Sequence, residues 1–289
     1  MWGQPYLVSR RGKSVRSPET VAKFRSLEDQ LASICADAVH EARQLAADVV
    51  DPRTADPNRC WNATWRIPLY ANARADAASR LVDRLHCKLN DNWQPLSSDR
   101  APAIRRERSG NTNAAFTLGQ LGEELCSVGG LARYRLFAIQ AAARALEPWF
   151  RDNPTPFAHL LDWPVGQRVE TLHQILNHTS IDELGGGPTY WGHVTVAHLL
   201  TDLGLGCKPD RQLNRAVRYL CLVDARTAKP PITLQKTVAV NAAVGELAQA
   251  VYGDREAATL RYVDKLLMEF SRQGIIDEAP DRGRATCRS

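Results

Sequence analysis

Residues 185–193 read Gly-Gly-Gly-Pro-Thr-Tyr-Trp-Gly-His, an apolar run follows over 194–203, and residues 207–211 read Cys-Lys-Pro-Asp-Arg. This order predicts a glycine-rich turn that opens a short helix, then a second turn, then Asp210 at the start of another helix. Backbone N–H groups at a glycine-rich helix start form an anion site, and phosphate is the usual anion. An aspartate at a helix start caps unpaired N–H groups and can also present a carboxylate to a substrate.

The rest of the chain has a helical period almost throughout. From Ser17 to Val49 apolar residues recur every three or four positions, as the buried face of one long helix requires. The alternation typical of strands is almost absent, and residues 91–113 are expected to form an exposed loop. The chain is therefore predicted to be all-α. Further helices are expected over about 70–90, 114–149 (with a break at Gly129-Gly130), 165–178, 190–203, 211–222, 234–252 and 255–273.

The length of 289 residues suffices for a large core or for two lobes. A hydrophobic content of 44% and a charged content of 24% are typical of a globular protein. We expect four parts along the chain: an N-terminal arm over 1–16, a helical lobe over 17–150, a second helical lobe over 151–277, and a disordered tail over 278–289.

The net charge, the cysteines and the N-terminal sequence indicate which partners and which cellular compartment to expect. A net charge of +5 is compatible with a polyanionic partner without requiring one. The seven cysteines are scattered, odd in number and without a Cys-x-x-Cys pair, which indicates reduced thiols in a cytoplasmic protein. The first dozen residues lack the apolar run of a signal peptide, and no run of 18 apolar residues predicts a membrane span. No metal-ligand spacing is present, so we expect no metal. We also expect no cofactor and a monomer.

The run from about residue 165 to 222 resembles the helix-hairpin-helix DNA glycosylase superfamily, above all in the Lys-Pro-Asp-Arg step into a helix. The resemblance implies a two-lobed helical fold whose hairpin grips the backbone of double-stranded DNA, with Asp210 as the catalytic carboxylate. Such an enzyme flips a damaged or modified base out of the duplex and hydrolyses its N-glycosidic bond. The residues that the resemblance and their position assign to DNA binding are Gly185, Gly187, Gly192, His193, Lys208, Arg211 and Arg215.

Two departures from that family limit the expected activity. Members that also cut the strand carry a nucleophilic lysine in the hairpin about 18–19 residues before the aspartate. Here that position falls on Trp191 and Gly192, and no lysine lies between residues 89 and 207. Only Cys221 and Cys287 follow Asp210, so the four-cysteine iron–sulfur cluster of some branches is not expected. The prediction is a monofunctional glycosylase that leaves an abasic site.

Aromatic residues offer candidates for the base pocket. Trp61 and Trp65 lie four apart, on one face of a helix, and Trp191 lies beside the hairpin. Each could stack on an extruded base or pack in the core.

The sequence does not indicate which base is excised. It therefore does not distinguish a role in repair from a role in defence against phage DNA that carries modified bases. The alternative function is a non-enzymatic helical DNA-binding or interaction protein that uses the hairpin for backbone contacts. In that case Asp210 only caps its helix and is turned back onto it, with Leu184 or Val194 filling the space in front. A catalytic Asp210 should instead face an open cleft between the lobes with Lys208 or Arg211 at its rim.

Overall fold

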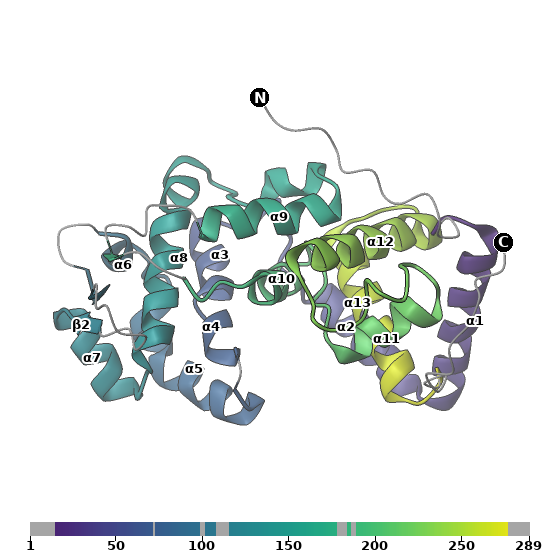
Figure 1. Cartoon of the computed structure of the whole chain (residues 1–289), viewed down its shortest axis with the longest axis horizontal. Helices are drawn as coiled ribbons and strands as arrows, with labels where there is room; N and C mark the ends of the chain where they lie inside the picture. Colours follow the sequence, from purple (N-terminus) through teal and green to yellow (C-terminus); the bar gives the residue numbers. More distant parts are fainter. Residues whose placement is uncertain are drawn as a thin grey trace. The chain divides into compact units, whose positions relative to one another are not determined.

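The computed structural model describes residues 15–71, 73–98, 102–107, 116–177, 184–185 and 189–276, and this part of the chain is mostly helical (Figure 1). The all-α prediction is therefore confirmed at the level of fold class. The arm over 1–16 lies almost entirely outside the described residues, and the tail over 278–289 lies wholly outside them.

By its internal contacts the chain divides into two compact units. The first unit comprises the described residues of segments 1–49, 163–169 and 204–289, and the second those of 50–162 and 170–203. Segments distant in sequence thus join in one unit, whereas the sequence-based expectation was of two consecutive lobes that meet near residue 150.

The first unit is a helical cluster around α13 (Ala257–Arg272). The helices α1, α2, α11 and α12 all pack against α13. The core of this unit includes a T-shaped contact between Phe24 and Phe270, whose ring centroids lie 5.5 Å apart. The bounds of the other helices are Pro18–Ile34 (α1), Ala36–Ala47 (α2), Arg211–Tyr219 (α11) and Leu234–Tyr252 (α12), together with the first turn of α9 (Val165–Leu176).

The single helix expected from Ser17 to Val49 is two helices in the structure. Ser17 caps α1 as predicted, because its hydroxyl accepts a hydrogen bond from the Thr20 N–H. The helix ends at Ile34, and Cys35 adopts a non-helical backbone (φ −146°, ψ 77°). A straight helix rises about 1.5 Å per residue and could not lay both halves along the shorter α13. The break at Cys35 lets α1 and α2 pack on each other and on α13.

The second unit is organised around α8 (Arg133–Asp152), against which α3, α4, α6, α7 and β1 pack. The predicted break at Gly129-Gly130 is confirmed, since Gly130 ends α7 in the left-handed conformation (φ 64°). Leu81, Val82, Leu85 and Leu89 are buried on α5 as predicted. The remaining elements are α3 (Pro57–Thr64), α4 (Ile67–Tyr70), α5 (Ala75–Leu89), α6 (Gln94–Ser97), α7 (Gln120–Gly129), the 3₁₀ helix η1 (Ala158–Asp162), the rest of α9, and α10 (His193–Asp202).

The expectation of an exposed loop over 91–113 is wrong for much of its described part. Strand β1 (Ile104–Arg106) pairs antiparallel with β2 (Phe116–Leu118), and Ile104 is fully buried. The side chain of the buried Gln140 donates to the Ile104 carbonyl and accepts from its N–H, both at 2.9 Å. Three-residue strands are too short to produce a visible period of two, so the pattern could not reveal this hairpin.

Candidate functional site

The connection between α9 and α10 is held at both ends by Asn177. Its amide nitrogen donates to the carbonyls of His173 (2.8 Å) and Trp191 (2.9 Å), and its amide oxygen accepts from the Thr189 hydroxyl (2.6 Å). Thr189 Oγ1 also accepts from the Trp191 N–H at 3.2 Å. One asparagine therefore ties the last turn of α9 to the residues that enter α10, a role that the sequence analysis did not assign.

Two of the three predicted phosphate-binding glycines lie in the described chain, and they differ in surroundings. Gly185 has a left-handed backbone (φ 97°), and a Cβ there would overlap the carbonyl oxygen of Arg106. Gly192 is exposed, caps α10 with an ordinary φ of −62°, and has open space where a Cβ would go. Gly187 lies outside the described residues. Packing accounts for glycine at position 185, whereas nothing packs closely at position 192.

This difference predicts opposite outcomes for two matched substitutions. Gly185→Ala should lower the free energy of unfolding by at least about 1 kcal/mol, because the methyl group meets the Arg106 backbone and the left-handed conformation disfavours alanine. Gly192→Ala should leave stability within about 0.5 kcal/mol of the parent. Urea denaturation followed by circular dichroism measures both. Equal stability of the two variants would contradict the close packing of Gly185.

A pair of histidines flanks the connection. His193 is the first residue of α10 and is partly exposed. Burial lowers the pKa of the His173 imidazole, and the charge of the nearby His193 lowers it further. The proposed contact of His193 with DNA stays a prediction.

Asp210 lies in the first unit at the start of α11. Its Oδ1 accepts a hydrogen bond from the Leu213 N–H at 2.9 Å, so the predicted capping role is confirmed. The side chain is partly exposed. Because the cap uses Oδ1, it occupies one of two carboxylate oxygens and is compatible with a second role for Oδ2.

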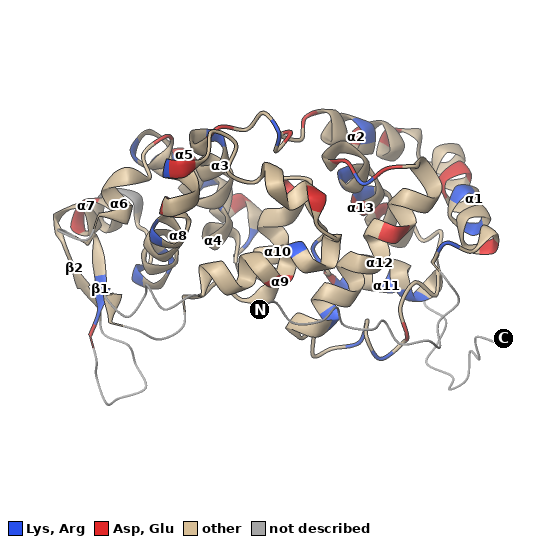
Figure 2. Cartoon of the chain, turned by 90° about the horizontal axis from the view of Figure 1, so that it is seen from above, with Lys and Arg blue, Asp and Glu red and all other residues tan. Residues whose placement is uncertain are grey.

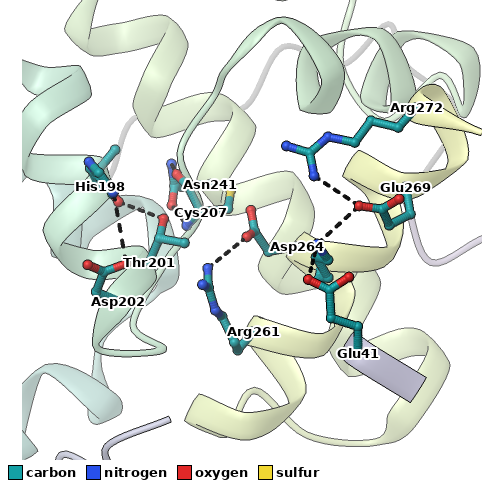
Figure 3. Close-up of polar contacts among 12 residues, drawn as sticks. Glu41, His198, Thr201, Asp202, Cys207, Asn241, Arg261, Asp264, Glu269 and Arg272 are labelled. Carbon is teal, nitrogen blue, oxygen red and sulfur yellow. Dashed lines mark hydrogen bonds and ion pairs between the residues drawn. The ribbon is translucent and has the colours of Figure 1, made fainter. Parts of the chain in front are cut away.

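The turn before Asp210 is anchored to α12 by a buried asparagine. Asn241 accepts from the Cys207 N–H (2.8 Å) and donates to the Cys207 carbonyl at 3.0 Å (Figure 3). It also donates to the Thr237 carbonyl at 3.0 Å. Burial raises the pKa of the Cys207 thiol well above the ordinary value, and the negative charges of Asp264 and Asp210 raise it further. Asn241 thus fixes the backbone three residues before the carboxylate, although it is 34 positions away from Cys207 in sequence.

The predicted cationic residues around Asp210 have different environments. Arg211 is exposed and Lys208 is partly exposed. Arg215 instead donates from Nη1 to Ser271 Oγ at 3.1 Å, and the same hydroxyl donates to Gln212. Arg215 therefore joins α11 to α13 in this structure, and its contact with DNA stays a prediction.

Helix α13 also carries a network of ion pairs. Lys265 lies 3.1 Å from both Glu41 and Glu269, and Arg272 lies 3.0 Å from Glu269 (Figure 3). Both basic and acidic residues occur on α1, α2 and α13 (Figure 2). Burial acts to raise the pKa of Glu269, but the hydrogen bonds from Gln273, Lys265 and Arg272 and the charge of Lys265 outweigh it and lower that pKa. These contacts stabilise the packing of the helices that support α11.

The three tryptophans proposed as base contacts are all fully buried. The indole N–H groups of Trp61, Trp65 and Trp191 donate to Leu89 O (2.7 Å), Asn90 Oδ1 (3.1 Å) and Ala138 O (2.8 Å). Burial together with a satisfied indole N–H is the signature of core packing. The structure thus favours the core alternative over a surface that stacks on a base.

A pocket with a volume of about 310 Å³ lies in the second unit and was not predicted. Its polar lining comes from Arg59, Asn62 and Arg66 at or just after α3, and from Asp202 at the end of α10. Asp202 lies 4.0 Å from His198. The charged groups of the lining are therefore two guanidinium groups and one carboxylate.

Comparison of the chain with models of known protein families, with curated proteins and with solved structures finds no match. No cluster of three or more histidine, cysteine or acidic side chains suited to a metal ion occurs among the described residues. Nor is any helix in the described ranges long and apolar enough to cross a membrane.

Proposed function

We propose that the protein is a monofunctional DNA glycosylase in which Asp210 is the catalytic carboxylate. The observation that carries the proposal is the order of elements along the chain: α9, a glycine-containing connection, α10, a short turn, and Asp210 at the first turn of α11. The helix-hairpin-helix glycosylases, which the sequence resembles, have their hairpin and their catalytic aspartate in this order. The fold class alone would not support the proposal, because helical proteins serve many functions.

The chemistry requires a carboxylate held rigidly near the sugar. Cleavage of an N-glycosidic bond builds positive charge on the sugar ring, as in other glycoside hydrolyses. A fixed carboxylate stabilises that charge and can orient the attacking water. The Leu213 cap and the Asn241 anchor supply the rigidity, and each would hold Asp210 before substrate arrives.

The direct test is a screen for base excision. The protein is incubated with duplexes that each contain one oxidised, alkylated, deaminated or hypermodified base, and with phage genomes rich in modified bases. Alkali then converts abasic sites into strand breaks. Breaks that appear only after alkali support the proposal, and the substrate that yields them distinguishes repair from defence. Absence of breaks across this panel would contradict it.

The missing hairpin lysine gives a second expected result. Borohydride added during the reaction should trap no covalent adduct between protein and DNA, because no amine lies where a Schiff base forms. Denaturing electrophoresis of the labelled duplex measures this. A trapped adduct that disappears in Lys208→Arg would make Lys208 a nucleophile and contradict monofunctional chemistry.

The cap bond of Asp210 also favours the second candidate, a DNA-binding or interaction protein without enzymatic activity. Both candidates predict binding that weakens with salt, since each neutralises phosphates. They differ in the effect of removing the negative charge of Asp210, because only the enzyme needs that charge for its activity.

A further inference from the structure

A cluster of aromatic rings surrounds one guanidinium group in the second unit. Arg106, on β1, is largely buried, and its guanidinium carbon lies 4.7 Å from the ring centroid of Phe137. The rings of Phe116 and Tyr190 lie 5.5 Å from the same carbon. Guanidinium groups are attracted to aromatic faces at these distances. Arg106 therefore holds together rings from β2, from α8 and from the connection that leads into α10.

Two tyrosines form the exposed side of this cluster. Tyr134 is 39% exposed and Tyr190 is 38% exposed. Their ring centroids lie 5.6 Å apart at an interplanar angle of 57°. Phe137, beneath Tyr190 in an edge-on contact at 6.3 Å, is fully buried. The cluster thus has a core half and a solvent half, and the solvent half consists of two adjacent phenol rings.

The backbone holds Tyr190 in this place at a conformational cost. Its φ is 66°, in the left-handed region that bulky residues rarely adopt. The next residue, Trp191, is fully buried and bonded to Ala138 O and Thr189 Oγ1, which fixes the chain on that side. Strained residues held by their surroundings concentrate at binding sites. As a result, the Trp191 ring lies in the core and the neighbouring Tyr190 ring lies at the surface.

Cationic groups lie beside the two tyrosines. Arg133 is exposed and donates to the Phe116 carbonyl at 3.0 Å, which places it at the edge of the cluster. The guanidinium carbon of Arg135 lies 5.6 Å from the Tyr134 ring. Exposed aromatic rings beside arginines are the combination by which proteins stack unpaired bases and hold the adjacent phosphates.

We propose that Tyr134 and Tyr190 form a stacking surface for an unpaired base of DNA. The inference rests on the proposed function, because Tyr190 belongs to the connection that would hold the DNA backbone. It replaces the buried tryptophans as the source of base stacking. The surface would bind a base that is no longer paired. A base inside a regular duplex is stacked between its neighbours, so its face is not accessible to a protein.

The test uses a duplex with 2-aminopurine as a single unpaired base and a fully paired duplex of the same sequence. Stacking of the unpaired base on a tyrosine should quench its fluorescence when the parent protein binds. Tyr134→Leu and Tyr190→Leu should abolish the quenching and weaken binding of the unpaired duplex by about fivefold or more, while affinity for the paired duplex stays unchanged. Tyr134→Phe and Tyr190→Phe should behave as the parent, because they keep the ring.

Tyr219 supplies a matched control. It is also 38% exposed, but it lies at the end of α11 against Lys23. The Tyr219→Leu variant should quench the 2-aminopurine fluorescence and bind both duplexes as the parent protein does. Thermal melting of every variant, with the phenylalanine variants as reference, separates loss of stacking from loss of folding.

The outcomes distinguish this inference from the proposed function. Unchanged quenching in both leucine variants overturns the stacking surface, even if base excision is observed. Loss of quenching in those variants supports it, even if no duplex is ever cleaved. A parent protein that binds neither duplex at low salt would overturn both.

Discussion

Asp210→Asn is expected to lower the rate of base excision by about a hundredfold or more, while binding of the same duplex should persist. Asparagine is as good a helix cap as aspartate, so its side-chain oxygen can still accept from the Leu213 N–H. The substitution therefore keeps the cap and removes only the negative charge, which in the proposed mechanism stabilises the developing charge on the sugar. Single-turnover excision and binding by fluorescence anisotropy measure the two effects separately.

The second unit offers a matched control for this substitution. Asp56 caps α3 in the same way, with Oδ1 accepting from the Arg59 N–H at 2.8 Å. Asp56→Asn should leave excision and binding unchanged. Full excision activity in Asp210→Asn would show that the carboxylate only caps, and the non-enzymatic candidate would then be favoured.

Trp191→Ala should lower the free energy of unfolding by about 3–5 kcal/mol, the range typical of large aromatic truncations in a core. The indole is fully buried, and its loss leaves a cavity and removes the hydrogen bond to Ala138 O. Urea denaturation followed by circular dichroism measures the change. Trp191→Phe should lower the free energy of unfolding by less, because phenylalanine keeps most of the apolar contact.

A partly exposed tryptophan of the same unit provides the comparison. Trp149, on α8, contacts Phe157 and His159 at the surface of its core, so Trp149→Ala should be the milder variant. If Trp191→Ala were as stable as the parent but bound an unpaired base more weakly, then the assignment of Trp191 to the core would be wrong.

Local signals predicted the helices well because capping and apolar period act over a few residues. The Ser17 cap, the inward row of α5 and the break after Gly129 follow from such signals, and α12 begins and ends where the period predicts. The break at Cys35 could not be predicted, because no glycine or proline marks it. It follows from the length of α13, which is contributed by the far end of the chain.

In the candidate site, too, contacts between residues close in sequence were predictable and contacts between distant residues were not. The cap formed by Asp210 was predictable, since donor and acceptor lie three residues apart. The anchors formed by Asn241 and Asn177, and the contact of Arg215 with Ser271, join residues far apart in sequence. A single sequence does not show which distant backbone groups an asparagine will meet. The burial of Trp61 and Trp65 is similarly a tertiary result, although their spacing correctly placed them on one face.

The assembly of the first unit from distant segments has a consequence for biosynthesis. At about 5–20 residues per second, α1 and α2 leave the ribosome roughly 10–40 s before α13, which follows about 200 residues later. Until then Phe24 and Leu31 have no Phe270 to pack against. The second unit, encoded almost entirely between them, can complete its own core first. The nascent chain therefore exposes the apolar faces of α1 and α2 until α13 is synthesised, and chaperones would shield those faces.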